Sequence, residues 1–359
     1  MSAAAKAEAE GAGTATFDRE VVRSMPKVEL HRHLEGSLAP EFFLAMAEEF
    51  SIDLPAGDAE GLASAITMVD QEPGFLPFLE RFETLRTFYV DPEIVKRAAR
   101  EAIRLAAEDN IRYLELRYNP LHFATQMAFP IESVIEWVTE ARDEAAAEFA
   151  LQVELIATVN RNDPVQESLP TIEAAIAGAG QYFAGIDIAG DENQGNLVRF
   201  AGVFRKARKA GLGITIHAGE VGPAANVRDA IRLLGADRIG HGIRILDDPE
   251  VVKLAKEAGV VFEVCPTSNL RTGVVKSIDQ HPIADMARAE LAVALSTDDP
   301  AICGTTLTDE YILVGNALGL EKNDFLELNL TALQGAFRPK DERADLASMF
   351  EDEFASAGE

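Results

Sequence analysis

The 359-residue chain has few of the features that several classes of protein require. Its two cysteines, Cys265 and Cys303, cannot form a disulfide framework, and such sparse use of cysteine fits the reducing cytosol. No apolar run reaches the roughly 18 residues of a membrane-spanning helix. The sequence therefore predicts a cytoplasmic protein without a membrane span.

Basic residues are also scarce. The chain has 33 lysines and arginines against 60 aspartates and glutamates, which gives a formal net charge of -27. A chain this acidic repels phosphate backbones and anionic membrane surfaces. We therefore expect that it binds neither nucleic acid nor membranes.

The first 16 residues are rich in Ala, Gly and Glu and lack the basic head and apolar core of a signal peptide. This composition predicts a disordered tail over residues 1–16. No linker rich in Pro, Gly or Ser divides the remainder, so we expect residues 17–359 to form one domain. The pattern leaves the oligomeric state open.

Short runs of apolar and β-branched residues recur eight times along the chain. They lie at 28–31, 113–117, 153–157, 185–189, 213–217, 238–240, 260–264 and 292–297. Helix-like segments lie between most of them, at 91–109, 130–147, 195–210, 227–234 and 248–258. Alternation of this kind is typical of parallel strands joined by crossover helices. Eight such units predict an α/β protein with a (β/α)8 TIM barrel, and a doubly wound open sheet is the alternative.

The first two predicted strands are separated by far more chain than one helix needs. The interval contains helix-like segments at 40–50 and 75–88, with a turn rich in Gly and Asp between them. We expect it to form a helical excursion that covers the mouth of the barrel. The chain from 322 to 359 is predicted to be helical and acidic.

Four of the six histidines follow the carboxyl ends of predicted strands, which is the active face of a barrel. His31 and His33 stand two residues apart at the end of the first strand, so both imidazoles point the same way. His217 ends the fifth strand, and His241 lies between two glycines after the sixth. This placement is the strongest functional signal in the sequence.

Carboxylates follow the same strand ends. Glu220 comes three residues after His217, beyond an Ala-Gly turn that lets it face the same cavity. Asp298 and Asp299 close the eighth strand, where buried carboxylates must be paired or metal-bound. For Asp299 the alternative is an ordinary helix N-cap, because Pro300 suits the first helical turn.

Three imidazoles and one carboxylate therefore share one rim. This donor set, with room for water, is typical of a catalytic zinc site. The four candidate ligands are His31, His33, His217 and Asp298. Glu220 and His241 remain as acid–base and electrostatic groups. We interpret the other two histidines more simply, with His122 near the mouth and His281 as a capping or surface group.

Several other chemistries have no motif in the chain. The zinc signature of cytidine deaminases, the Walker A loop, the dinucleotide-binding glycine motif and the nucleophile elbow are all absent. A hydrolase of amides or phosphoesters on a two-metal barrel, and a non-catalytic nucleoside-binding protein, remain as rival interpretations.

Taken together, six motifs resemble the adenosine deaminase family of metal-dependent hydrolases. They are His-Arg-His-Leu-Glu-Gly at 31–36, Asp-Ile-Ala-Gly-Asp-Glu at 187–192, Thr-Ile-His-Ala-Gly-Glu at 215–220, Gly-His-Gly at 240–242, Cys-Pro-Thr-Ser-Asn at 265–269 and Ser-Thr-Asp-Asp-Pro at 296–300. The resemblance implies a zinc barrel that hydrolyses adenosine and 2′-deoxyadenosine to inosine, deoxyinosine and ammonia in purine salvage.

The resemblance also implies roles for individual residues. His31, His33, His217 and Asp298 match the ligands of one zinc ion per chain. Glu220 matches the acid that protonates purine N1. His241 matches the residue that positions and stabilises the attacking nucleophile.

On the substrate side, Asp299 matches the group that faces purine N7, and the backbone of Gly190 matches the contact to N3. Phe78 and Phe82 fall where the family has an apolar gate over the ribose, and His33 borders the same space. The alternative for the two phenylalanines is the ordinary apolar face of an amphipathic helix.

Glu35 departs from the pattern, because adenosine deaminases usually have an Asp there that helps to hold the ribose 5′-hydroxyl. Glu at this place resembles adenine deaminases and some aminodeoxyfutalosine deaminases. The sequence predicts a purine nucleoside, adenosine, as the substrate. The alternative is a related 6-aminopurine, adenine or aminodeoxyfutalosine.

Overall fold

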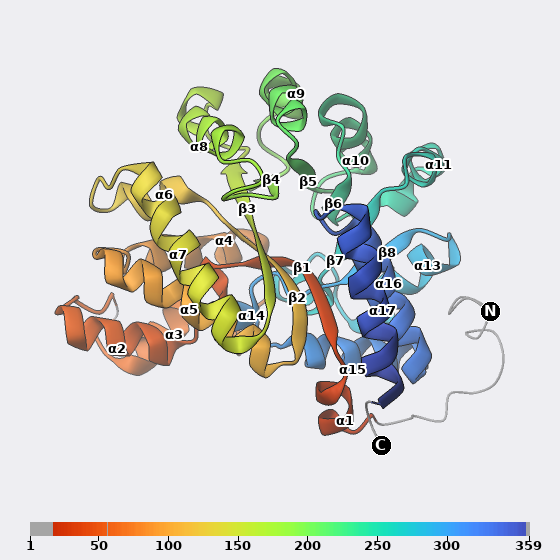
Figure 1. Ribbon diagram of the computed structural model, residues 1–359, viewed down its shortest axis with the longest axis horizontal. Helices are drawn as coiled ribbons and strands as arrows, with labels where there is room; N and C mark the ends of the chain where they lie inside the picture. Colours follow the sequence, from red (N-terminus) through yellow and green to blue (C-terminus); the bar gives the residue numbers. More distant parts are fainter. Residues whose placement is uncertain (1–16, 56, 357–359) are drawn as a thin grey trace.

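The computed structural model describes residues 17–55 and 57–356, so the predicted tail at 1–16 lies outside the described residues. Eight parallel strands form one sheet in the order β1 to β8, with helices around it (Figure 1). The strands are β1 (Lys27–His33), β2 (Ile111–Tyr118), β3 (Gln152–Asn160), β4 (Gly185–Ala189), β5 (Gly213–Ala218), β6 (Arg238–His241), β7 (Val261–Val264) and β8 (Ala292–Leu295).

The last strand meets the first through the residues that follow β8. The backbone N–H of Asp298 donates to the carbonyl of His31 at 2.9 Å, and the N–H of His33 donates to the carbonyl of Asp298 at 2.8 Å. These bonds close the sheet, which confirms the (β/α)8 barrel and excludes the open-sheet alternative. They also place Asp298 directly beside the two histidines of β1.

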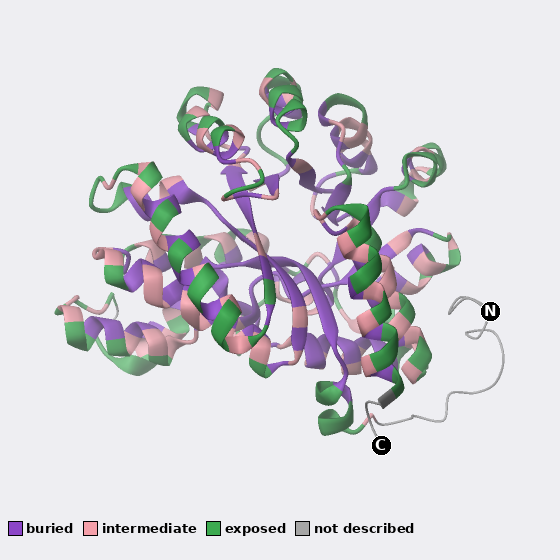
Figure 2. Cartoon of the chain, in the orientation of Figure 1, coloured by how far each residue is buried: buried purple, intermediate pink, exposed green. Residues whose placement is uncertain are grey.

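The connecting helices bury one face against the strands and leave the other in solvent, while the strands are buried on both faces (Figure 2). The helices of the barrel are α5 (Pro92–Glu108), α6 (Pro120–Thr125), α7 (Ile131–Phe149), α8 (Val165–Ala177), α9 (Ala201–Lys209), α10 (Ala224–Asp229), α11 (Pro249–Ala258), α12 (Pro266–Arg271), α13 (Ile283–Arg288), α14 (Pro300–Cys303), α15 (Leu307–Leu318), α16 (Lys322–Gly335) and α17 (Lys340–Ser356). A short helix, α1 (Arg19–Ser24), precedes β1.

The interval between β1 and β2 forms the predicted helical excursion. It contains η2 (Glu35–Ser37), α2 (Pro40–Phe50), α3 (Ala59–Ile66) and α4 (Phe75–Arg86). Helix α3 occupies part of the stretch predicted as a turn, because Asp58 caps it by accepting a hydrogen bond from the N–H of Gly61. The N–H of Met68 donates to the carbonyl of Ile302 at 2.7 Å, so the excursion is attached to the chain beyond β8.

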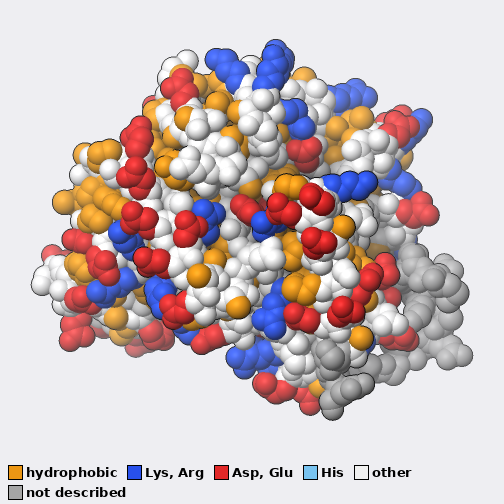
Figure 3. All heavy atoms as spheres, in the orientation of Figure 1, with side chains coloured by type: hydrophobic (Ala, Val, Ile, Leu, Met, Phe, Trp, Pro, Cys, Tyr) orange, Lys and Arg blue, Asp and Glu red, His pale blue; other side chains and the backbone are white. Residues whose placement is uncertain are grey.

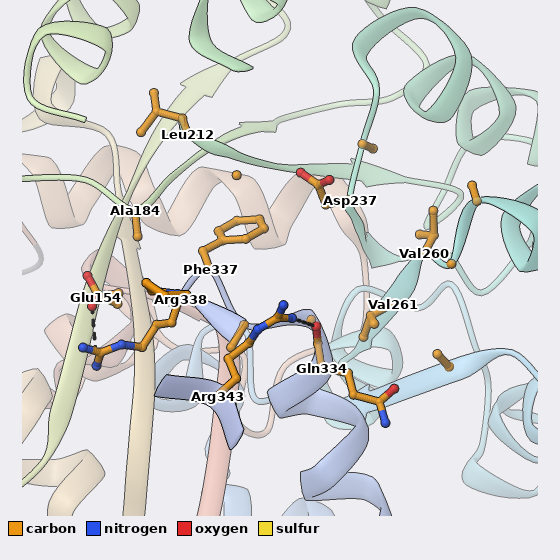
Figure 4. A pocket seen from close by; sticks show the side chains of 18 of the residues that line it. Glu154, Ala184, Leu212, Asp237, Val260, Val261, Gln334, Phe337, Arg338 and Arg343 are labelled. Atoms are coloured by element: carbon orange, nitrogen blue, oxygen red, sulfur yellow. Dashed lines mark hydrogen bonds and ion pairs between the residues drawn. The ribbon is translucent and has the colours of Figure 1, made fainter. Parts of the chain in front are cut away.

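The opposite, amino-terminal end of the barrel is closed by Phe337. A side chain at Gly185 or at Gly213 would overlap its ring, so both glycines make room for it. The guanidinium of Arg238 lies 3.6 Å from the centre of the same ring. Around Phe337 lies a hollow of about 1050 Å³ (Figure 4). Arg338, which borders it, is paired with two carboxylates of the same lining.

Acidic side chains are spread among lysines and arginines over the face seen in Figure 3, without one dominant acidic patch. Within 17–55 and 57–356, none of the helices combines the length and the apolar character that crossing a bilayer requires.

Candidate active site

Four side chains converge at the carboxyl end of the barrel. The ligand atoms of His31, His33, His217 and Asp298 all lie within 4.8 Å of one another, and all four residues are buried. Asp298 Oδ1 lies 3.0 Å from His31 Nε2 and 3.3 Å from His33 Nε2. His33 Nε2 lies 3.3 Å from His217 Nε2. The structure therefore brings together the four residues that the sequence singled out as candidate ligands.

The backbone after β8 directs the Asp298 carboxylate to this point. Asp298 has a φ of 66°, a left-handed conformation that is costly for a residue with a side chain. The backbone bonds to β1 hold it there, and Ser268 Oγ donates to Asp298 Oδ2 at 2.7 Å. The carboxylate is thus restrained by its backbone and by a side-chain donor.

A second ring of charged side chains lies behind the histidines, inside the barrel. His31 Nδ1 lies 2.7 Å from Glu263 Oε2, and His217 Nδ1 lies 3.0 Å from Asp187 Oδ1. Arg117 joins the two carboxylates, 2.8 Å from Glu263 and 3.3 Å from Asp187. This arrangement links β1, β2, β4, β5 and β7 beneath the four converging residues.

Both carboxylates of this ring are ionised. Burial alone would raise the pKa of Asp187, but His217 and Arg117 hold that pKa below its usual range. For Glu263, Arg117 and Arg238 overcome burial and hold the pKa well below its usual value. An ionised carboxylate can only accept, so each histidine donates from Nδ1 and keeps its Nε2 lone pair for the centre of the site.

The centre therefore has the donor set of a metal site. His31 Nε2 is buried and, although Asp298 Oδ1 is only 3.0 Å away, it makes no hydrogen bond of acceptable geometry among the described residues. Burial lowers the pKa of His217 to about 3, so this imidazole is neutral and available as a ligand. Several lone pairs and a carboxylate that face one another repel unless a cation lies between them. These residues could hold one divalent metal ion.

Glu220 lies beside this centre on the turn after β5. The carboxylate of Glu192 accepts hydrogen bonds from the backbone N–H groups of Gly219 and Glu220, each at 2.7 Å, and fixes the turn. Burial raises the pKa of Glu220 to about 7. A carboxyl with this pKa can give up a proton near neutral pH.

His241 lies on the same side, at the end of β6. Its Nε2 is 3.7 Å from Glu220 Oε2 and 3.9 Å from Asp298 Oδ2. It has a φ of 60°, which is uncommon for a residue other than glycine. The imidazole therefore faces the space between the acid and the candidate metal ligands.

Asp299 is buried against Gly36, where any larger residue would overlap its carboxyl group. In the part of the chain that the structure describes, Asp299 Oδ1 has no hydrogen-bond partner, and the side chain makes no capping bond to α14. Asp299 therefore occupies the N-cap position of α14, as the alternative interpretation expected, but its carboxyl group does not cap the helix. Burial, followed by the charge of Asp298, raises the pKa of Asp299 well above its usual value.

Glu35 lies in η2, directly before Gly36 in the sequence. Its Oε1 accepts a hydrogen bond from the backbone N–H of Asn119 at 3.3 Å, while Oε2 is buried without a partner among the residues described. Burial raises the pKa of Glu35. A protonated carboxyl can both donate and accept, which suits a hydroxyl or an amide of a ligand.

These groups face one cavity of about 230 Å³ beneath the excursion. Its lining includes the predicted site residues His33, Glu35, Phe78, Phe82, Gly190, His217, Glu220, His241, Asp298 and Asp299, together with His122. His31 lies in the ligand cluster but does not border the cavity. The rings of Phe78 and Phe82 are 6.1 Å apart and supply an apolar wall from α4.

Sequence reasoning assigned no role to several residues that organise the site. Glu263 stands inside an apolar strand, where a lone charge signals an inward-facing ion pair. His281 was expected to be a capping or surface group. It is buried and contacts Asn269, and its Nδ1 accepts a hydrogen bond from the backbone N–H of Ile283 at the start of α13. The surface interpretation is therefore wrong.

Comparison with known proteins identifies the family. The adenosine deaminase family model matches residues 26–353. An adenosine deaminase from Vibrio parahaemolyticus is 32% identical over 335 residues, which cover 92% of this chain and 99% of the relative. The chain belongs to the adenosine deaminase family. It is a hydrolytic deaminase, as the sequence predicted.

Solved structures show how varied the substrates of proteins similar to this deaminase are. An adenine deaminase from Arthrobacter aurescens has a TM-score of 0.85 and 27% identity, covering 92% of this chain and 98% of that chain. An amidohydrolase from Burkhoderia ambifaria with bound Zn has a TM-score of 0.86 and 26% identity, covering 98% and 96%. Proteins similar to this chain therefore include deaminases named for adenosine and for adenine, and one amidohydrolase with bound Zn.

Proposed function

We propose that this protein is a zinc-dependent deaminase that converts adenosine and 2′-deoxyadenosine into inosine, deoxyinosine and ammonia. One observation carries the proposal: a three-histidine, one-aspartate donor set lies beside a buried carboxyl that is protonated near neutral pH. Hydrolysis at purine C6 needs both a strong nucleophile and a proton for the ring. The four-residue donor set meets the first requirement, because it can hold a metal that activates water, and the carboxyl of Glu220 meets the second.

The ligands of one zinc ion would be His31, His33, His217 and Asp298. When bound there, zinc would act as a Lewis acid that makes water nucleophilic at neutral pH. Glu263 and Asp187 orient two of the histidines from behind. Such partners of the ligands usually matter for metal affinity.

The protein side chains then handle the purine. Protonated Glu220 gives its proton to N1, so that negative charge does not build up on the ring when C6 becomes tetrahedral. His241 orients the attacking water from the other side of the acid. Asp299, protonated because it is buried beside Asp298, donates to N7, since a bare carboxylate and N7 would both be acceptors.

Gly190 and the apolar wall complete the binding site in this proposal. The backbone of Gly190 contacts N3, and Phe78 and Phe82 cover the sugar. By excluding water, the wall keeps Glu220 protonated and strengthens each polar contact to the purine.

A second candidate is deamination of adenine or aminodeoxyfutalosine. Two observations favour it: Glu35 stands where this family usually has an Asp, and an adenine deaminase is among the similar structures. Against adenine as the substrate, the longer Glu35 side chain still borders the cavity, where it could hold a ribose hydroxyl.

A substrate panel tests the proposal. Zinc-loaded protein is incubated with adenosine, 2′-deoxyadenosine, adenine and aminodeoxyfutalosine, and the shift of the purine ultraviolet band is followed with elemental analysis of the same samples. We expect the highest kcat/KM for adenosine and one zinc per chain. Turnover of adenine alone would overturn the nucleoside assignment, and a stoichiometry of two metals would favour the amide and phosphoester hydrolases.

A further inference from the structure

A buried chain of hydrogen bonds runs from the back of His241 to the start of α13. Asn269 Nδ2 lies 3.2 Å from His241 Nδ1. Asn269 Oδ1 lies 3.2 Å from His281 Nε2, and the backbone N–H of Ile283 donates to His281 Nδ1 at 3.2 Å. His241, Asn269 and His281 are all buried. None of these contacts belongs to the candidate metal ligands.

The backbone N–H of Ile283, at the far end of this hydrogen-bond chain, determines which group donates in each bond. A backbone N–H can only donate, so His281 Nδ1 must accept. Burial lowers the pKa of His281 to about 4, so the ring is neutral and carries its single hydrogen on Nε2. His281 Nε2 therefore donates to Asn269 Oδ1, and Asn269 Nδ2 donates to His241 Nδ1.

The opposite orientation of the Asn269 amide is incompatible with this network. It would present Nδ2 to His281 Nε2, which would then have to accept. With Nδ1 already accepting from Ile283, the ring of His281 would carry no hydrogen at all, a state that imidazole does not reach in proteins. The amide orientation is thus determined by hydrogen-bonding roles, as assignments of this kind require.

We propose that Asn269 and His281 are positioning residues that hold His241 in the tautomer with its hydrogen on Nε2. That nitrogen faces Glu220 and Asp298, so His241 enters the site as a hydrogen-bond donor. If the protein deaminates purines as proposed, His241 holds the oxygen of the attacking water and does not take its proton. The two protons of the water pass instead to the Glu220 carboxylate, which has given its own proton to N1, and to the amino group that leaves as ammonia.

Nitrogen NMR of the zinc-loaded protein with ¹⁵N-labelled histidine tests the tautomer directly. The spectrum of a His241→Gln variant identifies the His241 signals by their loss. We expect a protonated, pyrrole-type signal for His241 Nε2 and an unprotonated, pyridine-type signal for Nδ1. A hydrogen on Nδ1 with a bare Nε2 would overturn the proposal, whatever the activity of the protein.

Substitution of Asn269 tests the link to catalysis. Asn269→Asp keeps the shape but removes the donor, so it draws the hydrogen of His241 onto Nδ1. We expect kcat to fall by about 10²–10³-fold, the range for the loss of one hydrogen-bond donor to a reacting oxygen, with KM for adenosine and zinc content within twofold of wild type. An unchanged kcat together with an unchanged His241 spectrum would contradict the proposal. If this variant does not fold, the wild-type spectrum decides.

Substitution of His281 provides the matched pair. His281→Leu removes the donor to Asn269 Oδ1 and should lower kcat by roughly fivefold to tenfold, the equivalent of one neutral hydrogen bond. His281→Gln restores an N–H donor at the place of Nε2 and should recover most of the rate and the wild-type His241 signals. Equal rates in the two variants would refute the positioning role. A wild-type protein that deaminates no 6-aminopurine would instead refute the proposed function and leave the nitrogen spectrum as expected.

Discussion

The protonation of Glu220 gives the most quantitative prediction. Its pKa of about 7, against an ordinary 4.5, means that about half of the molecules hold the proton at pH 7. An unperturbed carboxyl would hold it in only about one molecule in 300. Burial therefore increases the amount of usable acid by roughly 150-fold at neutral pH. The cavity under α4 is in this sense part of the catalytic apparatus.

Two consequences can be measured on adenosine. The protonated form is the active one, so kcat/KM should be highest below pH 7 and should fall about tenfold per pH unit above it. Glu220→Gln still donates a hydrogen bond but transfers no proton, so its kcat should drop by about 10²–10⁴-fold while zinc is retained. Glu80→Gln, on the exposed side of α4, is the control and should match wild type.

Steady-state kinetics from pH 5.5 to 9 decides between these outcomes. A Glu220→Gln variant within tenfold of the wild-type rate would remove Glu220 from the mechanism. A wild-type kcat/KM that stays level through this range would show that its protonation does not limit the reaction, and the reasoning from burial would fail.

Three further substitutions, with one control, test other parts of the structure. His217→Ala removes one proposed ligand and should weaken zinc binding by more than about 100-fold, and wild-type zinc content on elemental analysis would refute the ligand role. Phe337→Ala opens the amino-terminal end of the barrel and should cost about 2–3 kcal/mol of unfolding free energy in urea titration, since the ring is only partly buried. Leu233→Ala at an exposed position should cost less than about 0.5 kcal/mol, and equal losses would show that Phe337 is not a special contact. Glu35→Ala should raise KM for adenosine by about tenfold and leave KM for adenine unchanged, and a parallel rise for both would exclude a contact to the sugar.

The barrel was predictable because its signals are local. Each strand is a mostly apolar run of a few residues, and the polar residues at or just after the ends of the first, fifth, sixth and eighth runs are brought to one rim by the parallel arrangement. The boundaries were less predictable. The eighth strand was expected to extend to 297 but ends at Leu295, because Asp298 leaves the extended conformation to turn its carboxylate toward β1.

The partners of the residues behind the ligands were not predictable from local pattern, although a lone charge in an apolar strand marks Glu263 as inward-facing. Glu263 lies 232 positions from His31 in sequence, and only the closed barrel places them 2.7 Å apart. In the sequence, His281 is only a histidine before a proline. Its proposed role in positioning His241 depends on Asn269, which lies between the two rings. Such contacts are created by tertiary packing, which no window of the sequence contains.

Every step proposed above depends on one metal ion between His31, His33, His217 and Asp298. Anomalous diffraction at the zinc edge from crystals of zinc-loaded protein tests it most directly. We expect a single strong peak about 2.0–2.2 Å from an atom of each of these four side chains. A zinc peak only at another position on the protein, or no peak at this position in fully loaded protein, would contradict the proposed metal site.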